Sequence, residues 1–139
     1  SREWLGAAAE AAMWLRDAGR LAGVLAALEA DRPAGRIPAG WQTEFEAARD
    51  ALQGDTAAAL AGFDKARLVW ESLGARLHLA LNRIHLVLLC PGTPEAASAA
   101  GEARRLAAEM GAPTLLTLLE RATAATAPRQ GRGPAPGPG

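Results

Sequence analysis

Side chains capable of chemistry recur at positions i, i+4 and i+7 of one apolar segment: His78, Asn82 and His85. In a helix this spacing aligns them on one stripe. They could be metal ligands, a polar line that faces a partner in a groove, or solvated or internally hydrogen-bonded side chains. A zinc site needs further ligands, yet Cys90 lies off the stripe and no nearby carboxylate completes the set. The sequence therefore predicts no metal site, and it favours solvation or internal hydrogen bonds over partner contact.

Cys90 is the only cysteine, so it cannot form a disulfide within the chain. It is expected at the C-terminal end of a helix, whereas activation of a thiol needs a nearby cation or a helix N-terminus. We therefore predict a buried, unreactive thiol rather than a nucleophile. The chain also contains no GxxxxGK(S/T), HExxH or GxSxG pattern. We expect a protein without catalytic residues and without a cofactor, and an enzyme with a cavity between helices is the minor alternative.

The composition limits what the chain can bind. Of its 139 residues 50% are hydrophobic and only 4% aromatic, and 15 basic residues balance 15 acidic ones. Binding of nucleic acid usually needs a basic face, but Arg is scattered among Asp and Glu, so we expect no nucleic-acid partner. No run reaches the roughly 18 apolar residues that span a bilayer, and the first residues do not resemble a signal peptide. We therefore expect a cytoplasmic segment of a longer protein, without membrane contact.

A repeated segment is the clearest pattern in the chain. Residues 55–75 correspond to residues 92–112, so that Ala59 matches Ala96 and Ala66 matches Ala103 at an offset of 37 positions. A period of this size, with small residues at fixed positions, is typical of stacked helical hairpins. Such hairpins bury their apolar faces only against their neighbours and form an extended scaffold. The sequence thus predicts an all-α array of stacked antiparallel helical hairpins, with about seven helices.

Apolar periodicity and the Gly, Pro and capping residues locate the predicted elements. We predict one helical domain over residues 1–126 and a disordered Pro/Gly-rich tail over residues 127–139. Hairpins are expected at 3–30, 41–74 and 76–111, with a first helix at 3–17, an internal loop at 31–40 and a capping helix at 113–126. Trp4, Trp14 and Trp70 are expected to pack in the core or between hairpins, although Trp4 and Trp14 could instead cover an exposed end.

Residues 54–66 resemble the second half of a tetratricopeptide repeat. In that motif Gly-Asp at the turn is followed by a small residue, by an aromatic residue four positions later and by Ala three positions after that. The matching residues are Gly54, Asp55, Ala59, Phe63 and Ala66. The second copy has Ala100 at the aromatic position, and the first helices of the hairpins do not show the usual motif. The resemblance implies a right-handed superhelix whose concave face is lined by the first helix of each hairpin.

Residues 42–122 are also similar to the divergent, Ala-rich repeats near the C-terminus of large bacterial signalling ATPases, the adenylate-cyclase-type and LuxR-type regulators. No LuxR-type helix-turn-helix is present, which favours the cyclase-type parent. The resemblance implies a non-catalytic interaction or sensory scaffold that binds a partner helix or peptide, or another domain of the parent chain, on its concave face. The residues expected at that contact are Trp41, Glu44, His78, Asn82 and His85. Trp41 could instead close a gap between hairpins.

A second function is also compatible with the sequence. The net charge is zero, and the ends of the array are rich in Ala and Leu. Zero net charge gives little electrostatic protection against self-association. The alternative prediction is therefore a structural module that forms a homodimer.

Overall fold

The computed structural model describes residues 2–31 and 35–126, and within them all regular structure is α-helical. The helices of this part of the chain are α1 (Arg2–Trp14), α2 (Ala18–Asp31), α3 (Arg36–Leu52), α4 (Thr56–Ser72), α5 (Arg76–Leu89), α6 (Pro94–Met110) and α7 (Pro113–Thr126). The predicted all-α class is therefore confirmed. The tail over residues 127–139, predicted to be disordered, lies outside the described residues.

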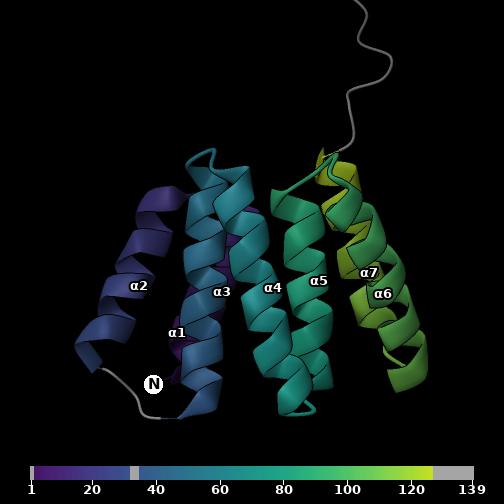
Figure 1. Ribbon diagram of the computed structural model, residues 1–139, viewed down its shortest axis with the longest axis horizontal. Coiled ribbons are helices and arrows are strands. Elements are labelled where there is room, and N and C mark those ends of the chain that lie inside the picture. The colour runs from purple at the N-terminus through teal and green to yellow at the C-terminus, as the bar shows by residue number, and fades with distance from the viewer. Residues whose placement is uncertain (1, 32–34, 127–139) are drawn as a thin grey trace, which may run out of the picture.

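Each helix packs against the next one along the chain, and α2 to α6 follow one another across the view of Figure 1. α1 packs on α2, α3 on α4 and α5 on α6, and α7 packs on both α5 and α6. α5 also contacts α1, α3 and α4, which places it in the middle of the array. In Figure 1 α1 lies behind α3, and from there it reaches α5. The superhelical curvature implied by the resemblance stays a prediction.

Local signals in the sequence set several helix boundaries. The Asp55 carboxylate accepts a hydrogen bond from the Ala58 N–H, and the Thr93 hydroxyl accepts one from the Ala96 N–H, each at 3.1 Å. These bonds satisfy backbone donors that have no partner inside the helix. α6 ends at Gly111, whose φ of 59° is left-handed, a conformation that glycine adopts without steric cost. The expected starts of α4 and α6 and the end of α6 are therefore confirmed.

Two predicted boundaries are wrong. α3 begins at Arg36 rather than at residue 41, because Pro38 falls in the first helical turn, where a backbone N–H has no acceptor within the helix. α1 ends at Trp14 rather than at residue 17, and Arg16 adopts a left-handed φ of 53°. The turn that follows α1 is tied to α5, since Nη1 of Arg16 donates a hydrogen bond to the Leu88 carbonyl oxygen at 3.3 Å.

Close approach of α3 and α4 forms the middle of the core. A Cβ added to Gly62 of α4 would lie 2.8 Å from Cβ of Ala47, and one added to Gly40 of α3 would lie 2.6 Å from the Trp70 ring. The two helices therefore meet at positions where only glycine fits. Trp70 and Phe63 supply the bulk that the alanines lack, and both are almost fully buried. No described helix is long and apolar enough to cross a bilayer.

Candidate functional site

Three helices meet at a buried histidine. Nε2 of His85, on α5, lies 2.5 Å from Oε1 of Glu10 on α1, and its Nδ1 lies 2.5 Å from Oε2 of Glu44 on α3. His85 and Glu44 are each 3% exposed, so water does not replace these contacts. A carboxylate only accepts hydrogen bonds, and a ring nitrogen that donates to one must carry a proton. The geometry therefore holds His85 as an imidazolium that donates from both ring nitrogens.

The electrostatics of this trio agree with its geometry. Burial alone would lower the pKa of His85, but the charge and hydrogen bond of Glu10, together with those of Glu44, outweigh burial and raise the pKa to about 10. Burial would likewise raise the pKa of Glu10, but the charge and hydrogen bond of His85 outweigh it and lower that pKa. At neutral pH the imidazolium and the Glu10 carboxylate are thus both charged.

The second oxygen of Glu44 is also saturated with donors. Its Oε1 accepts hydrogen bonds from Nε1 of Trp70 at 3.0 Å and from Nδ2 of Asn82 at 2.7 Å. Asn82 is 0% exposed, and its Nδ2 also donates to the Phe63 carbonyl oxygen on α4 at 3.0 Å. With donors at both oxygens, Glu44 is held as a carboxylate. It joins α3 to α4 and α5 at one point.

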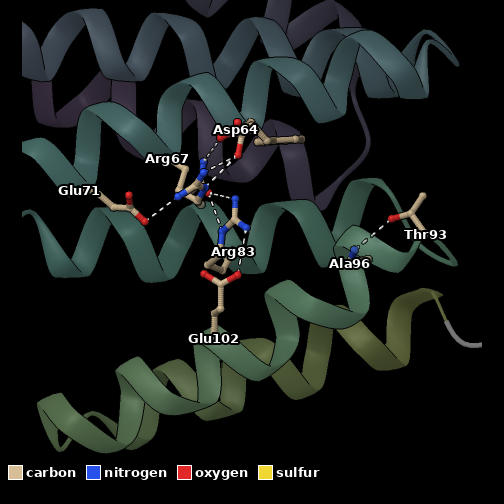
Figure 2. Close-up of polar contacts among 9 residues, drawn as sticks. Asp64, Arg67, Glu71, Arg83, Thr93, Ala96 and Glu102 are labelled. Atoms are coloured by element: carbon tan, nitrogen blue, oxygen red, sulfur yellow. Dashed lines mark hydrogen bonds and ion pairs between the residues drawn. The ribbon is translucent and has the colours of Figure 1, made fainter.

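Asn82 extends the network to the opposite side of α5. Its Oδ1 accepts hydrogen bonds from Nε and Nη2 of Arg83 at 2.9 and 2.6 Å. Arg83 is 5% exposed, and its Nη1 lies 3.6 Å from Oε1 of Glu102 on α6. Figure 2 shows Arg83 between α4 and α6, with Glu102 pointing towards it and Arg67 of α4 beside it. A continuous line of hydrogen bonds and ion pairs therefore runs from α1 through α3 and α5 to α6.

A cavity of about 140 Å³ opens beside His85. Its lining includes the aromatic rings of Trp41, Phe45 and Trp70, and the imidazole of His78. His78 stacks on Trp70 with ring centroids 4.6 Å apart and lies 6.0 Å from the Trp41 ring. Burial lowers the pKa of His78, although the charge of Glu44 opposes the shift, so this ring is neutral at neutral pH.

The arrangement lacks the parts of a nucleophilic or metal centre. Both nitrogens of His85 are engaged by carboxylates, so neither is free to activate a hydroxyl or thiol. The two carboxylates flank opposite sides of the ring, and no group of three or more His, Cys, Asp or Glu side chains in the described residues could hold a metal ion. Cys90 is 2% exposed, and burial raises its pKa to about 11, so the thiol stays protonated at neutral pH. The predicted buried thiol is confirmed.

All the residues predicted to contact a partner gather at this site: Trp41, Glu44, His78, Asn82 and His85. Trp41 and His78 are half-buried and line the cavity, and partner contact through them stays a prediction. Glu44, Asn82 and His85 are instead buried and bonded to one another. Partner contact through these three also stays a prediction, and it would need a chemical group that enters the cavity, which Glu44 and His85 help to line. The internal hydrogen bonds that the sequence favoured for Asn82 and His85 are present.

Sequence reasoning missed Glu10 and Arg83 and treated Trp70 only as a core residue. A signal for Glu10 existed, because it is the only charged residue between Trp4 and Leu15. A lone carboxylate in an apolar helix is rarely buried unless it is paired. Its partner, His85, lies 75 positions away in the sequence. The spacing of apolar residues within one helix gives no information about a contact between residues so far apart.

A second surface lies between α1 and α2. It is a groove of about 310 Å³ whose lining includes Trp4, Ala8, Ala11, Gly23 and Ala27. The Trp4 side chain is 69% exposed, which corrects the expectation that it packs in the core and agrees with the alternative that it lies at an exposed end. The buried residues of the lining are Leu5 and Val24, and the exposed residues beside them include the small Ala11, Gly23 and Ala27. Small exposed residues on both helices would let the backbone of another helix approach closely.

Comparison of the chain with protein-family models, with curated proteins and with solved structures finds no match. A functional assignment therefore rests on the described residues and on the sequence resemblance alone.

Proposed function

We propose that this chain is a non-catalytic protein-interaction scaffold within a larger cytoplasmic bacterial signalling regulator, and that its α1–α2 groove binds an amphipathic helix of a protein partner. The observation that carries the proposal is the exposed apolar groove with Trp4 at its rim. Contiguous apolar patches on a protein surface mark interaction sites. The resemblance to tetratricopeptide arrays supports the general class of protein-interaction scaffold, and the groove is the surface that we propose for the contact.

The shape and chemistry of the groove favour a helix as its occupant. The lining consists of residues from both helices, with Leu5 and Val24 buried and the small Ala11, Gly23 and Ala27 exposed. Arg20 is the only charged residue of the lining, and it pairs with Asp17. An apolar helix face therefore meets few polar groups that would lose water. Burying Trp4 against such a face would contribute about 3–4 kcal/mol before the entropic cost of association.

A panel of synthetic amphipathic helical peptides with Leu/Ala faces tests the proposal. We expect at least one peptide to bind and to cover the Trp4 ring, and Trp4→Ala to weaken its binding about tenfold or more, since a tryptophan that is buried in an interface often dominates binding. Leu77→Ala is the matched control, because Leu77 of α5 is 54% exposed and lies outside the groove. The proposal fails if no peptide binds, or if both variants bind as the wild type does.

Self-association is a second candidate, and one feature of the groove favours it. A symmetric dimer needs one patch that carries both a protrusion and a matching hollow. The Trp4 side chain protrudes beside a hollow of about 310 Å³, so two copies could each insert this ring into the other. The mass measured by light scattering across a concentration series tests this. A dimer that Trp4→Ala abolishes and Leu77→Ala leaves intact supports it, and a monomer at every concentration excludes it.

A further inference from the structure

The cavity beside His85 is separate from the α1–α2 groove and has a different character. Its volume is about 140 Å³, close to that of protein cavities that hold one benzene-sized molecule, about 150 Å³. α1, α3, α4 and α5 all contribute to its wall. It therefore suits one small chemical group and not a peptide segment or a helix.

Aromatic rings form much of the wall. Trp41 and Phe45 come from α3, and Trp70 comes from α4. His78 of α5 covers part of the Trp70 face, with ring centroids 4.6 Å apart. The faces of Trp, Phe and Tyr rings carry partial negative charge and attract cations that lose their water. A wall of this kind distinguishes a cation from a neutral group of the same size.

The fixed charges of the wall sum to about one negative charge. Glu10 and Glu44 contribute two carboxylates, and His85 contributes one imidazolium between them. A cation in the cavity would therefore meet a net attractive field, which low dielectric strengthens. A free anion would be repelled by the same field.

Hydrogen bonding in the cavity further limits which cations could bind there. The carboxylate oxygens of Glu10 and Glu44 already accept from His85, Trp14, Trp70 and Asn82. Across the described residues no buried side-chain nitrogen or oxygen lacks a partner. A primary ammonium would give up its hydrogen bonds to water and would find only carboxylate oxygens that already accept at least one bond. A fully methylated ammonium carries the charge without any N–H donor, so it loses nothing of this kind.

We propose that the cavity lined by Trp41, Trp70 and Glu10 binds a quaternary ammonium group. The group could belong to a free small molecule such as choline or to a trimethylated lysine side chain, and both present the same methylated cation. The site does not depend on the proposed helix-binding groove, whose lining contains none of these three residues.

Isothermal titration calorimetry with choline tests the proposal, and 3,3-dimethyl-1-butanol serves as the neutral control of the same shape. We expect choline to bind at least tenfold more tightly than the alcohol, because only choline carries the charge that the rings and carboxylates attract. N-acetyl-trimethyllysine amide is titrated in parallel. Binding of choline alone assigns the site to a free small molecule, and binding of the lysine derivative alone assigns it to a trimethylated lysine side chain. Binding of both shows that the site recognises the methylated cation that the two share.

Variants keep the test independent of simple misfolding. Trp41→Leu should weaken choline binding about tenfold, Trp41→Phe should recover part of the loss, and Glu10→Gln should weaken binding several-fold. Trp4→Leu is the matched control, since Trp4 lies outside the cavity, and it should bind choline as the wild type does. The proposal is overturned if neither choline nor N-acetyl-trimethyllysine amide binds, if the alcohol binds as tightly as choline, or if folded Trp41→Leu protein binds the cation unchanged.

Discussion

Mild alkali should destabilise this protein, and His85 sets the size of the effect. The fold raises the pKa of His85 from 6.5 to about 10, so the folded chain keeps a proton that the unfolded chain releases. A group with a raised pKa stabilises the fold fully below its unfolded pKa, and the contribution is lost as pH rises through its folded pKa. Between about pH 7 and about pH 9 this linkage lowers the free energy of unfolding by about 2–3 kcal/mol. That is a large part of the roughly 5–15 kcal/mol typical of a domain.

This pH window separates His85 from the other buried groups. The pKa of His78 is lowered by burial, so its titration in the folded state is complete below the window. The pKa of Cys90 is raised from 9.0 to about 11, so its own destabilising contribution begins near the pKa of the unfolded thiol and amounts to only about 0.4 kcal/mol at about pH 9. A fall in stability between these limits therefore reports His85.

Urea unfolding followed by circular dichroism at about pH 7, 8 and 9 measures the effect. Glu10→Gln removes one of the two carboxylates that hold the proton on His85, so its stability should depend less steeply on pH than that of the wild type. Glu109→Gln is the control, because Glu109 pairs with Arg76 and Arg105 at the surface, and its slope should match the wild type. A wild-type stability that does not change across the window would refute the reasoning, as would an unchanged slope in Glu10→Gln.

Other parts of the fold give further expected outcomes. Gly62→Ala should lower the free energy of unfolding by about 1–3 kcal/mol, since the new Cβ would lie 2.8 Å from that of Ala47; an unchanged urea midpoint would contradict this close approach. Thr93→Ala should cost about 1 kcal/mol by removing the hydroxyl that accepts from the Ala96 N–H, and the same urea titration should show Thr93→Ser near wild type. Cys90 in the native protein should react with a thiol reagent far more slowly than in urea, because its pKa is about 11 and it is buried; rapid labelling at neutral pH would speak against it.

Features that depend on neighbouring residues could be predicted from the sequence. Asp55 and Thr93 cap helices because their side chains reach a backbone N–H three residues ahead, and this requires nothing from the rest of the fold. The left-handed end of α6 at Gly111 follows in the same way. The predicted start of α3 is wrong because a proline usually signals a break in a helix, whereas Pro38 lies in the first helical turn, where a proline is tolerated.

Features that depend on distant residues could be predicted only in part. The stripe of His78, Asn82 and His85 was visible as a polar face of one helix, and all three do adjoin the same region. The sequence did not show that this face points into the protein, because the carboxylates that bond to His85 belong to α1 and α3. Glu44 lies 41 positions before His85, and Glu10 lies 75 positions before it. No local sequence pattern predicts that Glu10 of α1 contacts His85 of α5.

The alanine-rich core gives a reason for the buried network. Alanine side chains are small and alike, so helices that meet through them can slide or rotate with little change in contact. Hydrogen bonds are directional, and Glu44 can accept from Trp70, Asn82 and His85 together only when α3, α4 and α5 are in one register. Replacing a whole buried ionic network by apolar residues is often neutral or stabilising. Our hypothesis is therefore that the network mainly selects one arrangement of the helices and adds little to the free energy of unfolding. Glu10→Gln tests this as well: a less cooperative urea transition and a weakened near-UV dichroism spectrum are expected, and a variant that keeps both would leave the network as a source of stability alone.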